Sequence, residues 1–190
     1  MNAYWQGWDK RYQDGFYYGP LQPHQLVSRF WSMAPAGSPV IDIAMGTGRD
    51  LFVFAEKGWL CCGLDRSWEG IKTALQGASE RGLQLSPICG DAYHLPFKKG
   101  SAGAVLVFYF LVREIMGDLV SLLRPGGILM YETFLQDQND LDRPRNPDYL
   151  LHHGELIGYF RGLDLMFYEE GTFLFEGKKR AVARYVGRKR

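Results

Sequence analysis

Cysteine is scarce in this chain, and its cysteines form no pairable set. Three occur among 190 residues, two of them adjacent at Cys61 and Cys62, and no C-x-x-C motif is present. A disulfide framework needs an even, spaced set of cysteines, and a zinc site needs thiol or imidazole ligands at fixed spacing. The three thiols are therefore expected to be reduced core residues, and no metal is expected.

Long hydrophobic segments are also missing. No apolar run approaches the ~20 residues that a membrane-spanning helix requires. The first residues, MNAYWQGWDKRYQ, lack the basic and then apolar pattern of an export signal. These absences predict a cytoplasmic protein with no membrane partner.

An excess of charge of one sign is absent as well, since the formal net charge is +1. The charge is unevenly distributed, because the last thirteen residues, KKRAVARYVGRKR, carry seven basic groups and no acid. Nucleic-acid-binding domains usually present a basic surface across the whole domain. A terminal strand with solvated basic ends is therefore favoured, and nucleic acid is not an expected partner.

What the sequence does contain is an alternation of short apolar runs and helical segments. The apolar runs cover residues 40–44, 59–64, 85–89, 104–109 and 128–133, and helical spacing covers 49–57, 68–81 and 113–123. Uninterrupted apolar strands that alternate with helices predict an α/β fold, with a parallel sheet covered on both faces. Two later strand-like runs, 163–170 and 180–188, predict a hairpin of antiparallel strands at one edge.

The stretch VIDIAMGTGRDLF, residues 40–52, ends the first predicted strand with two glycines. Ligands of parallel sheets bind at the carboxyl ends of strands. Gly46 permits a sharp turn there, and Gly48 lets the backbone approach a ligand without an intervening Cβ. A dinucleotide fingerprint needs a third glycine where Leu51 stands, and no Lys-Ser or Lys-Thr completes a phosphate loop. The pattern therefore disfavours NAD, FAD and nucleoside triphosphates.

Two further strand ends carry groups that suit a nucleoside. Asp65 ends the second strand, where a carboxylate can accept hydrogen bonds from both ribose hydroxyls; a cap for the next helix is the structural alternative. Asp91 and Ala92 follow the third strand, where a carboxylate and a backbone N–H can read an adenine edge, although Gly-Asp is also common in turns. Phe108 and Tyr109 end the fourth strand and either flank the ligand or belong to the core.

These motifs together resemble the class I S-adenosylmethionine-dependent methyltransferases. The matching segments are DIAMGTG, Asp65, GDAYHLPF and LLRPGGILMYET, in the family's order and spacing. The resemblance implies a Rossmann-like, mostly parallel seven-stranded sheet of order 3-2-1-4-5-7-6, with the last strand antiparallel and helices on both faces. It also implies S-adenosyl-L-methionine as the cofactor. The cofactor-binding residues it implies are Trp8, Tyr12, Tyr18, Asp42, Gly46, Thr47, Gly48, Asp65, Arg66, Asp91, Ala92 and Phe108.

Within that family the chain looks most like the tellurite-resistance and thiopurine methyltransferase group. WDKRYQDGFYYG resembles their N-terminal segment, in which Trp8, Tyr12 and Tyr18 would close over the cofactor; packing of these aromatics on the sheet is the alternative. The glycines of residues 1–19 make a long regular helix there doubtful. Residues 1–190 are thus expected to form one domain, with an aromatic lid and helix (1–36), a cofactor-binding half (37–133) and a substrate-side half ending in the hairpin (134–190).

The methyl acceptor is less well defined by the sequence. Tyr109 stands near the point where thiopurine-type enzymes carry a substrate-facing arginine, and no amine-reading N/D-P-P-Y motif is present. Weak candidates for substrate contacts are Tyr109, Arg113, Arg143, Arg145 and His152. Two arginines in DRPRNP could clamp an anion or be surface charges, and His152 could cap a helix. No catalytic residue is identified, because the protein mainly has to align an already activated methyl group, and a thiolate or selenolate nucleophile can react without a general base.

The sequence therefore predicts a methyltransferase that acts on a small molecule, with a sulfur or chalcogen nucleophile favoured, as a monomer or homodimer. A methyltransferase-like module that binds cofactor or a partner without transfer is the main alternative. An oxidoreductase with an atypical fingerprint, and an RNA methyltransferase suggested only by the basic tail, are weaker alternatives.

Overall fold

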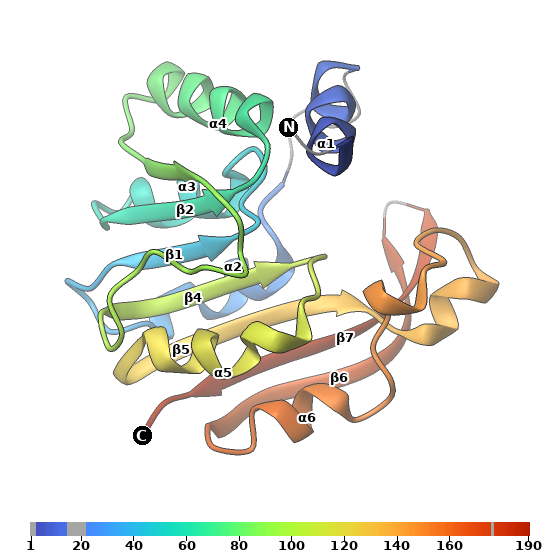
Figure 1. Ribbon diagram of the computed structural model, residues 1–190. Helices are drawn as coiled ribbons and strands as arrows, with labels where there is room; N and C mark the ends of the chain where they lie inside the picture. Colours follow the sequence, from blue (N-terminus) through green and yellow to red (C-terminus); the bar gives the residue numbers. More distant parts are fainter. Residues whose placement is uncertain (1–2, 15–21, 176) are drawn as a thin grey trace.

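The predicted apolar runs form the parallel part of a seven-stranded sheet (Figure 1). The computed structural model describes residues 3–14, 22–175 and 177–190. The parallel strands are β1 (Val40–Ile43), β2 (Cys61–Asp65), β3 (Ser86–Cys89), β4 (Ala102–Phe108) and β5 (Leu123–Phe134). Every residue of β1 and β4 is buried, as expected for central strands covered on both faces.

The strand order is β3-β2-β1-β4-β5-β7-β6, which confirms the predicted fold class. β6 (Asp164–Phe175) and β7 (Lys178–Arg188) form the expected hairpin, and β7 is antiparallel to β5 as well. The start of β7 therefore lies beside the end of β5. The register pairs Glu132 of β5 with Arg184 of β7.

Two boundaries differ from the sequence prediction. β5 begins at Leu123 and includes the RPGG segment that the sequence suggests as a turn, with an irregular register against Ala102 and Ala104. The helix expected over 113–123 is split into a 3-10 turn, η2 (Arg113–Ile115), and α5 (Met116–Leu122). Strand pairing thus decides where the helix ends.

Helices cover the two faces of the sheet separately (Figure 1). α2 (Gln25–Phe30), α3 (Arg49–Ala55) and α4 (Trp68–Glu80) contribute to one buried cluster, and α5 and α6 (Glu155–Tyr159) to the other. Three further 3-10 turns are η1 (Trp31–Met33), η3 (Gln136–Asp140) and η4 (Pro147–Tyr149). Of the helices in the described ranges, none has the length and apolar character needed to cross a bilayer.

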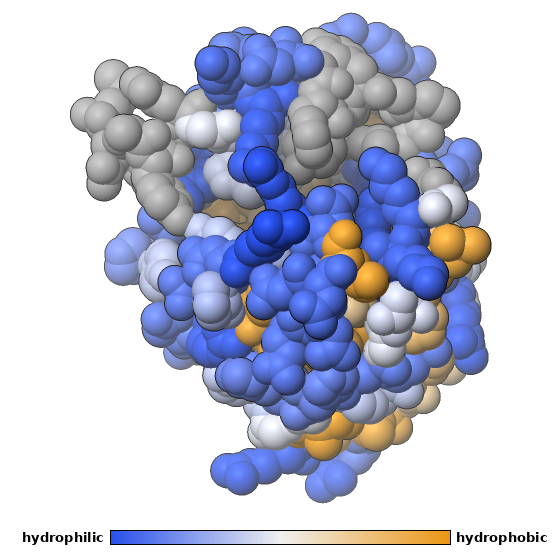
Figure 2. Space-filling view, turned by 90° about the vertical axis from the view of Figure 1, so that its right-hand side faces the viewer, coloured by the Kyte–Doolittle hydropathy of each residue, from blue (hydrophilic) through white to orange (hydrophobic). Residues whose placement is uncertain are grey.

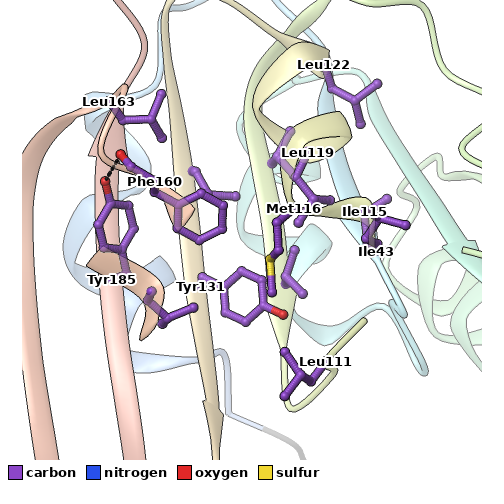
Figure 3. Close-up of a cluster of buried hydrophobic side chains, with 14 of the residues drawn as sticks. Ile43, Leu111, Ile115, Met116, Leu119, Leu122, Tyr131, Phe160, Leu163 and Tyr185 are labelled. Carbon is purple, nitrogen blue, oxygen red and sulfur yellow. Dashed lines mark hydrogen bonds between the residues drawn. The ribbon is translucent and has the colours of Figure 1, made fainter. Parts of the chain in front are cut away.

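The core beneath α5 and α6 joins β5 and β7 through aromatic rings (Figure 3). The Phe160 ring centroid lies 5.8 Å from that of Tyr131 and 5.1 Å from that of Tyr185. The Tyr185 hydroxyl donates to the Phe160 carbonyl oxygen at 3.2 Å. Leu119 of α5 is fully buried in the same cluster. This packing fixes β7 against the parallel strands and so places its first residues at the sheet's carboxyl edge.

The N-terminal segment forms a regular helix where the sequence made one doubtful. α1 (Ala3–Gln13) is an eleven-residue helix that passes through Gly7. It lies beside α4 (Figure 1). A glycine inside a helix costs only roughly 0.5–1 kcal/mol, which contacts of α1 with α4 can offset.

Candidate active site

The turn after β1 holds three residues in the left-handed backbone region. Gly46 and Gly48 have φ of 53° and 71°, and Ala44 has a φ of 61°. A Cβ built on Gly46 would lie 2.6 Å from the Tyr12 hydroxyl oxygen. The absence of a side chain at Gly46 therefore allows Tyr12 to lie against the turn. Ala44 is the position that sequence reasoning missed, since nothing about an alanine signals a positive φ.

Asp65 lies at the end of β2 and binds the glycine turn directly. Its Oδ2 accepts from the Gly46 N–H at 2.7 Å, and its Oδ1 accepts from the Ser67 N–H at 2.8 Å. Burial raises the pKa of Asp65, while these two bonds and the Arg66 charge oppose that rise. Each carboxylate oxygen can accept a second hydrogen bond. Asp65 therefore retains acceptor capacity for the hydroxyls of a ligand at this turn.

The adenine-reading candidates follow β3 on the same edge. The register pairs Asp65 with Cys89, and the Gly90 N–H donates to the Asp65 carbonyl oxygen at 2.9 Å. Asp91 comes next and accepts the Tyr93 N–H at 3.1 Å through its own Oδ1. Asp91 and Ala92 are both half-buried. The sheet thus brings the two nucleoside motifs of the sequence onto neighbouring strand ends.

α1 docks on these strand ends through Asp9 and Tyr12. Asp9 Oδ1 accepts from the Ser67 hydroxyl at 2.6 Å and from the Glu69 N–H at 3.2 Å, at the start of α4. The Tyr12 hydroxyl lies beside Gly46, as described above. Trp8 is 36% exposed, with the Arg11 guanidinium 4.6 Å from its ring centroid. Tyr18 lies outside the described residues.

A buried carboxylate lies beneath the turn. Burial, reinforced by Asp50, raises the pKa of Asp42 well above its ordinary value, and Arg49 opposes that rise. Asp50 accepts from the His24 backbone N–H at 2.5 Å and from Arg49 Nε at 3.1 Å. The other two predicted cofactor residues, Thr47 and Arg66, are half-buried on the loops that follow β1 and β2. Asp42 is only 3% exposed, so it is a buried residue of β1.

The end of β4 shows a second strained residue. Tyr109 has a φ of 54°, and its N–H donates to the Glu132 carbonyl oxygen at 2.8 Å. Phe108 is stacked on the His24 ring at a centroid distance of 4.0 Å. A non-glycine residue held at positive φ is uncommon, and such strain clusters at functional sites.

Sequence reasoning missed a buried charge network behind Tyr109. His24 Nε2 lies 3.0 Å from Glu132 Oε1, and Arg184 Nε donates to Glu132 Oε2 at 2.7 Å. Arg184 Nη1 also binds Glu169 at 2.5 Å. Burial alone would raise the pKa of Glu132, but His24, with Arg184 and Tyr109, holds it below its ordinary value. No spacing in the sequence links residues 24, 132 and 184, so only the sheet register reveals this group.

The residues suggested as substrate contacts do not form one group: Arg113 is bonded within the protein, whereas Arg143 and Arg145 are exposed. Arg113 is held by Glu155, with Nε 2.6 Å from Oε1, and it donates to the Asp148 and Leu150 carbonyl oxygens. Arg143 and Arg145 are exposed on the loop after η3, and the Arg143–Pro144 peptide bond is cis. The bonds of Arg113 fix the connection between β5 and α6.

His152, the last of the sequence candidates, contacts Gln136 Oε1 at 2.9 Å through its Nδ1. In the described part of the chain, no group of three or more His, Cys, Asp or Glu side chains is placed to hold a metal ion.

The face toward which β4 and β5 point is mostly hydrophilic, with hydrophobic residues in small separate groups (Figure 2).

Comparison with known proteins agrees with this architecture. Residues 40–127 match the family model described as a methyltransferase domain. The chain is 28% identical over 117 residues to the demethylmenaquinone methyltransferase of Thermobifida fusca, covering 54% of this chain and 49% of that protein. It is 32% identical over 107 residues to the Corynebacterium urealyticum protein of the same name, covering 54% and 44%. The chain thus spans about half the length of these curated relatives.

Solved structures share the fold over more of the chain. TehB from Haemophilus influenzae superposes with a TM-score of 0.74 at 17% identity, covering 96% of this chain and 67% of that one. A SAM-dependent methyltransferase from Methanosarcina mazei gives 0.70 at 16% identity, covering 89% and 99%. At such identities the likeness shows the fold alone.

Proposed function

We propose, from the methyltransferase domain over residues 40–127 and the class I fold around it, that this chain transfers a methyl group from S-adenosylmethionine to a small molecule. The observation that carries the proposal is the bond between the Gly46 N–H and the Asp65 carboxylate at 2.7 Å. It joins the side-chain-free turn to the acid at the neighbouring strand end. The sequence resemblance favours a sulfur or chalcogen nucleophile as acceptor.

The residues at this edge fit an adenosine-type cofactor. Gly46 presents backbone without a Cβ, and Asp65 retains acceptor capacity for ribose hydroxyls. Gly48, which the sequence suggested as a point of approach to the ligand, instead faces the side chains of Ala74, Leu85 and Met45 and serves the packing of the turn. Asp91 and Ala92 offer a carboxylate and an N–H on the next strand end, where an exocyclic amine and a ring nitrogen would be read. Tyr12, over Gly46, would contact the part of the cofactor nearest the turn.

The chemistry required of the protein is mainly alignment. When bound, the cofactor supplies a methyl group already activated on a sulfonium. Phe108 and Tyr109 lie one strand over from the glycine turn, since β4 pairs with β1. Tyr109, which is half-buried, would hold the acceptor in line and exclude water, whereas Phe108 is a buried core residue stacked on His24. Orientation of this kind can supply about 7–11 kcal/mol of the barrier. An acceptor that ionises readily, such as a thiol, needs little base assistance, and no base is assigned.

Calorimetry with S-adenosylmethionine tests the proposal, with Asp65→Ala as the first variant. Loss of a carboxylate that accepts ribose hydroxyls should weaken binding roughly 10- to 100-fold. Asp118→Ala is the matched control, because Asp118 is exposed on α5. Absence of binding heat with the unaltered protein would refute the proposal.

Transfer of a labelled methyl group to a panel of thiols, selenols and phenols then separates an enzyme from a binding module. Turnover on any of them identifies an enzyme. Cofactor binding without transfer to any acceptor favours the module that the sequence left open.

A further inference from the structure

The carboxyl edge of the sheet holds a cationic and aromatic group beside the proposed methyl-transfer site. Its members are Tyr109 after β4, Phe134 at the end of β5, Phe175 at the end of β6, and Arg180 near the start of β7. All four are half-buried. Because β7 is antiparallel, its early residues reach the same edge at which β1 and β4 end. We call these four residues the Arg180 cluster.

The cluster is held by ring contacts and one hydrogen bond. Arg180 Nη1 donates to the Tyr109 hydroxyl at 3.1 Å. The guanidinium carbon of Arg180 lies 5.4 Å from the Tyr109 ring centroid and 5.5 Å from that of Phe175. The Tyr109 and Phe134 centroids are 5.1 Å apart. The arginine is thus positioned between two aromatic rings at a fixed place on the edge.

Arg184 lies four residues along the same strand and provides a comparison, because its guanidinium is bound by carboxylates of the protein. Arg184 binds the carboxylates of Glu132 and Glu169, and its guanidinium carbon lies 4.2 Å from the Phe173 ring centroid. Arg180 has no carboxylate within 4.0 Å among residues 3–14, 22–175 and 177–190, and its one hydrogen bond goes to a neutral phenol. A guanidinium carries five N–H donors. Within those described ranges, most of the Arg180 donors therefore have no protein partner and can serve an acceptor that binds at this edge.

The cluster also lies next to the cofactor side of the site. Tyr109 directly follows β4, which pairs with β1, and the Arg49 guanidinium beside the glycine turn is within electrostatic reach of the Tyr109 phenol. Burial and the Glu132 carboxylate raise the pKa of Tyr109 far above its ordinary value, whereas Arg180 lowers it. The phenol therefore stays protonated and acts as a fixed polar contact.

We infer that the methyl acceptor carries a carboxylate on a planar, largely apolar body, and that Arg180, held in place by Tyr109, binds this carboxylate and determines specificity for it. This inference rests on the proposed function and names its substrate class. The guanidinium fork binds a carboxylate through two parallel hydrogen bonds. The half-buried rings of Phe134 and Phe175 supply the apolar surface for the planar body.

Binding of a matched pair of probes tests the inference without turnover. Calorimetry compares 4-mercaptobenzoate with 4-mercaptobenzamide, with and without saturating S-adenosylhomocysteine. The carboxylate probe should bind at least about tenfold more tightly than the amide, as expected for charge-assisted hydrogen bonds. In Arg180→Gln the two probes should bind with about equal affinity. Lys179→Gln, at the neighbouring exposed position whose side chain points to the opposite face of β7, should keep it.

Arg180→Lys provides a second variant if the glutamine variant does not fold. A lysine keeps the charge but not the planar fork, so the preference should fall without disappearing. Equal binding of both probes, binding of neither, or an unchanged preference in both Arg180 variants would overturn the inference. Loss of S-adenosylhomocysteine binding contradicts only the proposed function, because probe discrimination is measured separately on the protein alone.

Discussion

At the residue scale, the turn after β1 concentrates backbone conformations that side chains disfavour. Ala44, Gly46 and Gly48 all have positive φ. A Cβ on Gly48 would meet Ala74, Leu85 and Met45 at 3.1–3.3 Å, tighter than ordinary packing contacts. Ala44, by contrast, already carries a Cβ in a conformation that glycine adopts without penalty. The two positions therefore predict opposite outcomes of exchanging glycine and alanine.

Gly48→Ala should destabilise the fold by about 2 kcal/mol, because left-handed backbone costs a non-glycine residue roughly 1–2 kcal/mol and the new methyl is crowded. Ala44→Gly should change the free energy of unfolding by less than about 1 kcal/mol, since relief of strain offsets the greater chain entropy of glycine. Urea unfolding of both variants measures these values. A cost of Ala44→Gly as large as that of Gly48→Ala would contradict the role given to this turn.

At the scale of elements, α1 is attached to the Rossmann-like sheet through the start of α4. Ser67 caps α4 by accepting the Gly70 N–H at 3.1 Å, and its hydroxyl donates in turn to Asp9. A carboxylate at this point also interacts favourably with the helix dipole. Asp9 therefore couples the position of α1 to a helix that begins three residues after the proposed ribose-binding acid.

Asp9→Ala should release α1 while leaving the sheet intact. Backbone amides of residues 3–13 should exchange hydrogen markedly faster, and S-adenosylmethionine affinity should fall several-fold because Tyr12 leaves the glycine turn. Hydrogen-exchange mass spectrometry and calorimetry provide the measurements. Asp14→Ala, which alters an exposed acid next to α1, is the control. Unchanged exchange in Asp9→Ala would show that other contacts hold α1.

At the scale of the whole molecule, one charge network connects segments that are far apart in the chain. His24 precedes α2, Glu132 lies two residues before the end of β5, and Arg184 lies on β7. Glu132 is fully buried, and its pKa is held below the ordinary value of 4.5 despite the opposing effect of burial. Removing one partner of a buried ion pair leaves an uncompensated charge, which is more costly than never having had the pair.

Glu132→Gln should therefore lower the free energy of unfolding by about 3 kcal/mol near neutral pH. A carboxyl with a lowered folded-state pKa stabilises the fold above its unfolded pKa, and this contribution is lost as pH falls through the folded value. The difference in free energy of unfolding between wild type and Glu132→Gln should therefore become smaller below pH 4.5. Urea unfolding at a series of pH values measures this difference. Glu169→Gln should cost less, since that side chain is 35% exposed, and a pH-independent gap would contradict the mechanism.

Sequence patterns predicted the parallel strands, the terminal hairpin and the loops that meet at the carboxyl edge. They did so because strand burial, helix spacing and glycine turns are local properties, read from neighbours such as Gly46 and Gly48. The helix α1 was missed because its docking through Asp9 depends on Ser67 and Glu69, about sixty residues away. Ala44 was missed because the surrounding structure, and not its residue type, imposes its backbone conformation.

The sequence by itself determined an α/β fold with a mostly parallel sheet and the order of the motifs proposed to bind cofactor, since each motif lies within a few residues of one strand end. Only the tertiary structure decided which side chains meet across strands. The antiparallel β7 carries Arg184 to Glu132 and Arg180 to Tyr109, 71 residues apart in the chain. From the sequence these arginines look like part of a basic tail. Sheet register gives Arg184 two carboxylate partners and gives Arg180 a bond to a phenol.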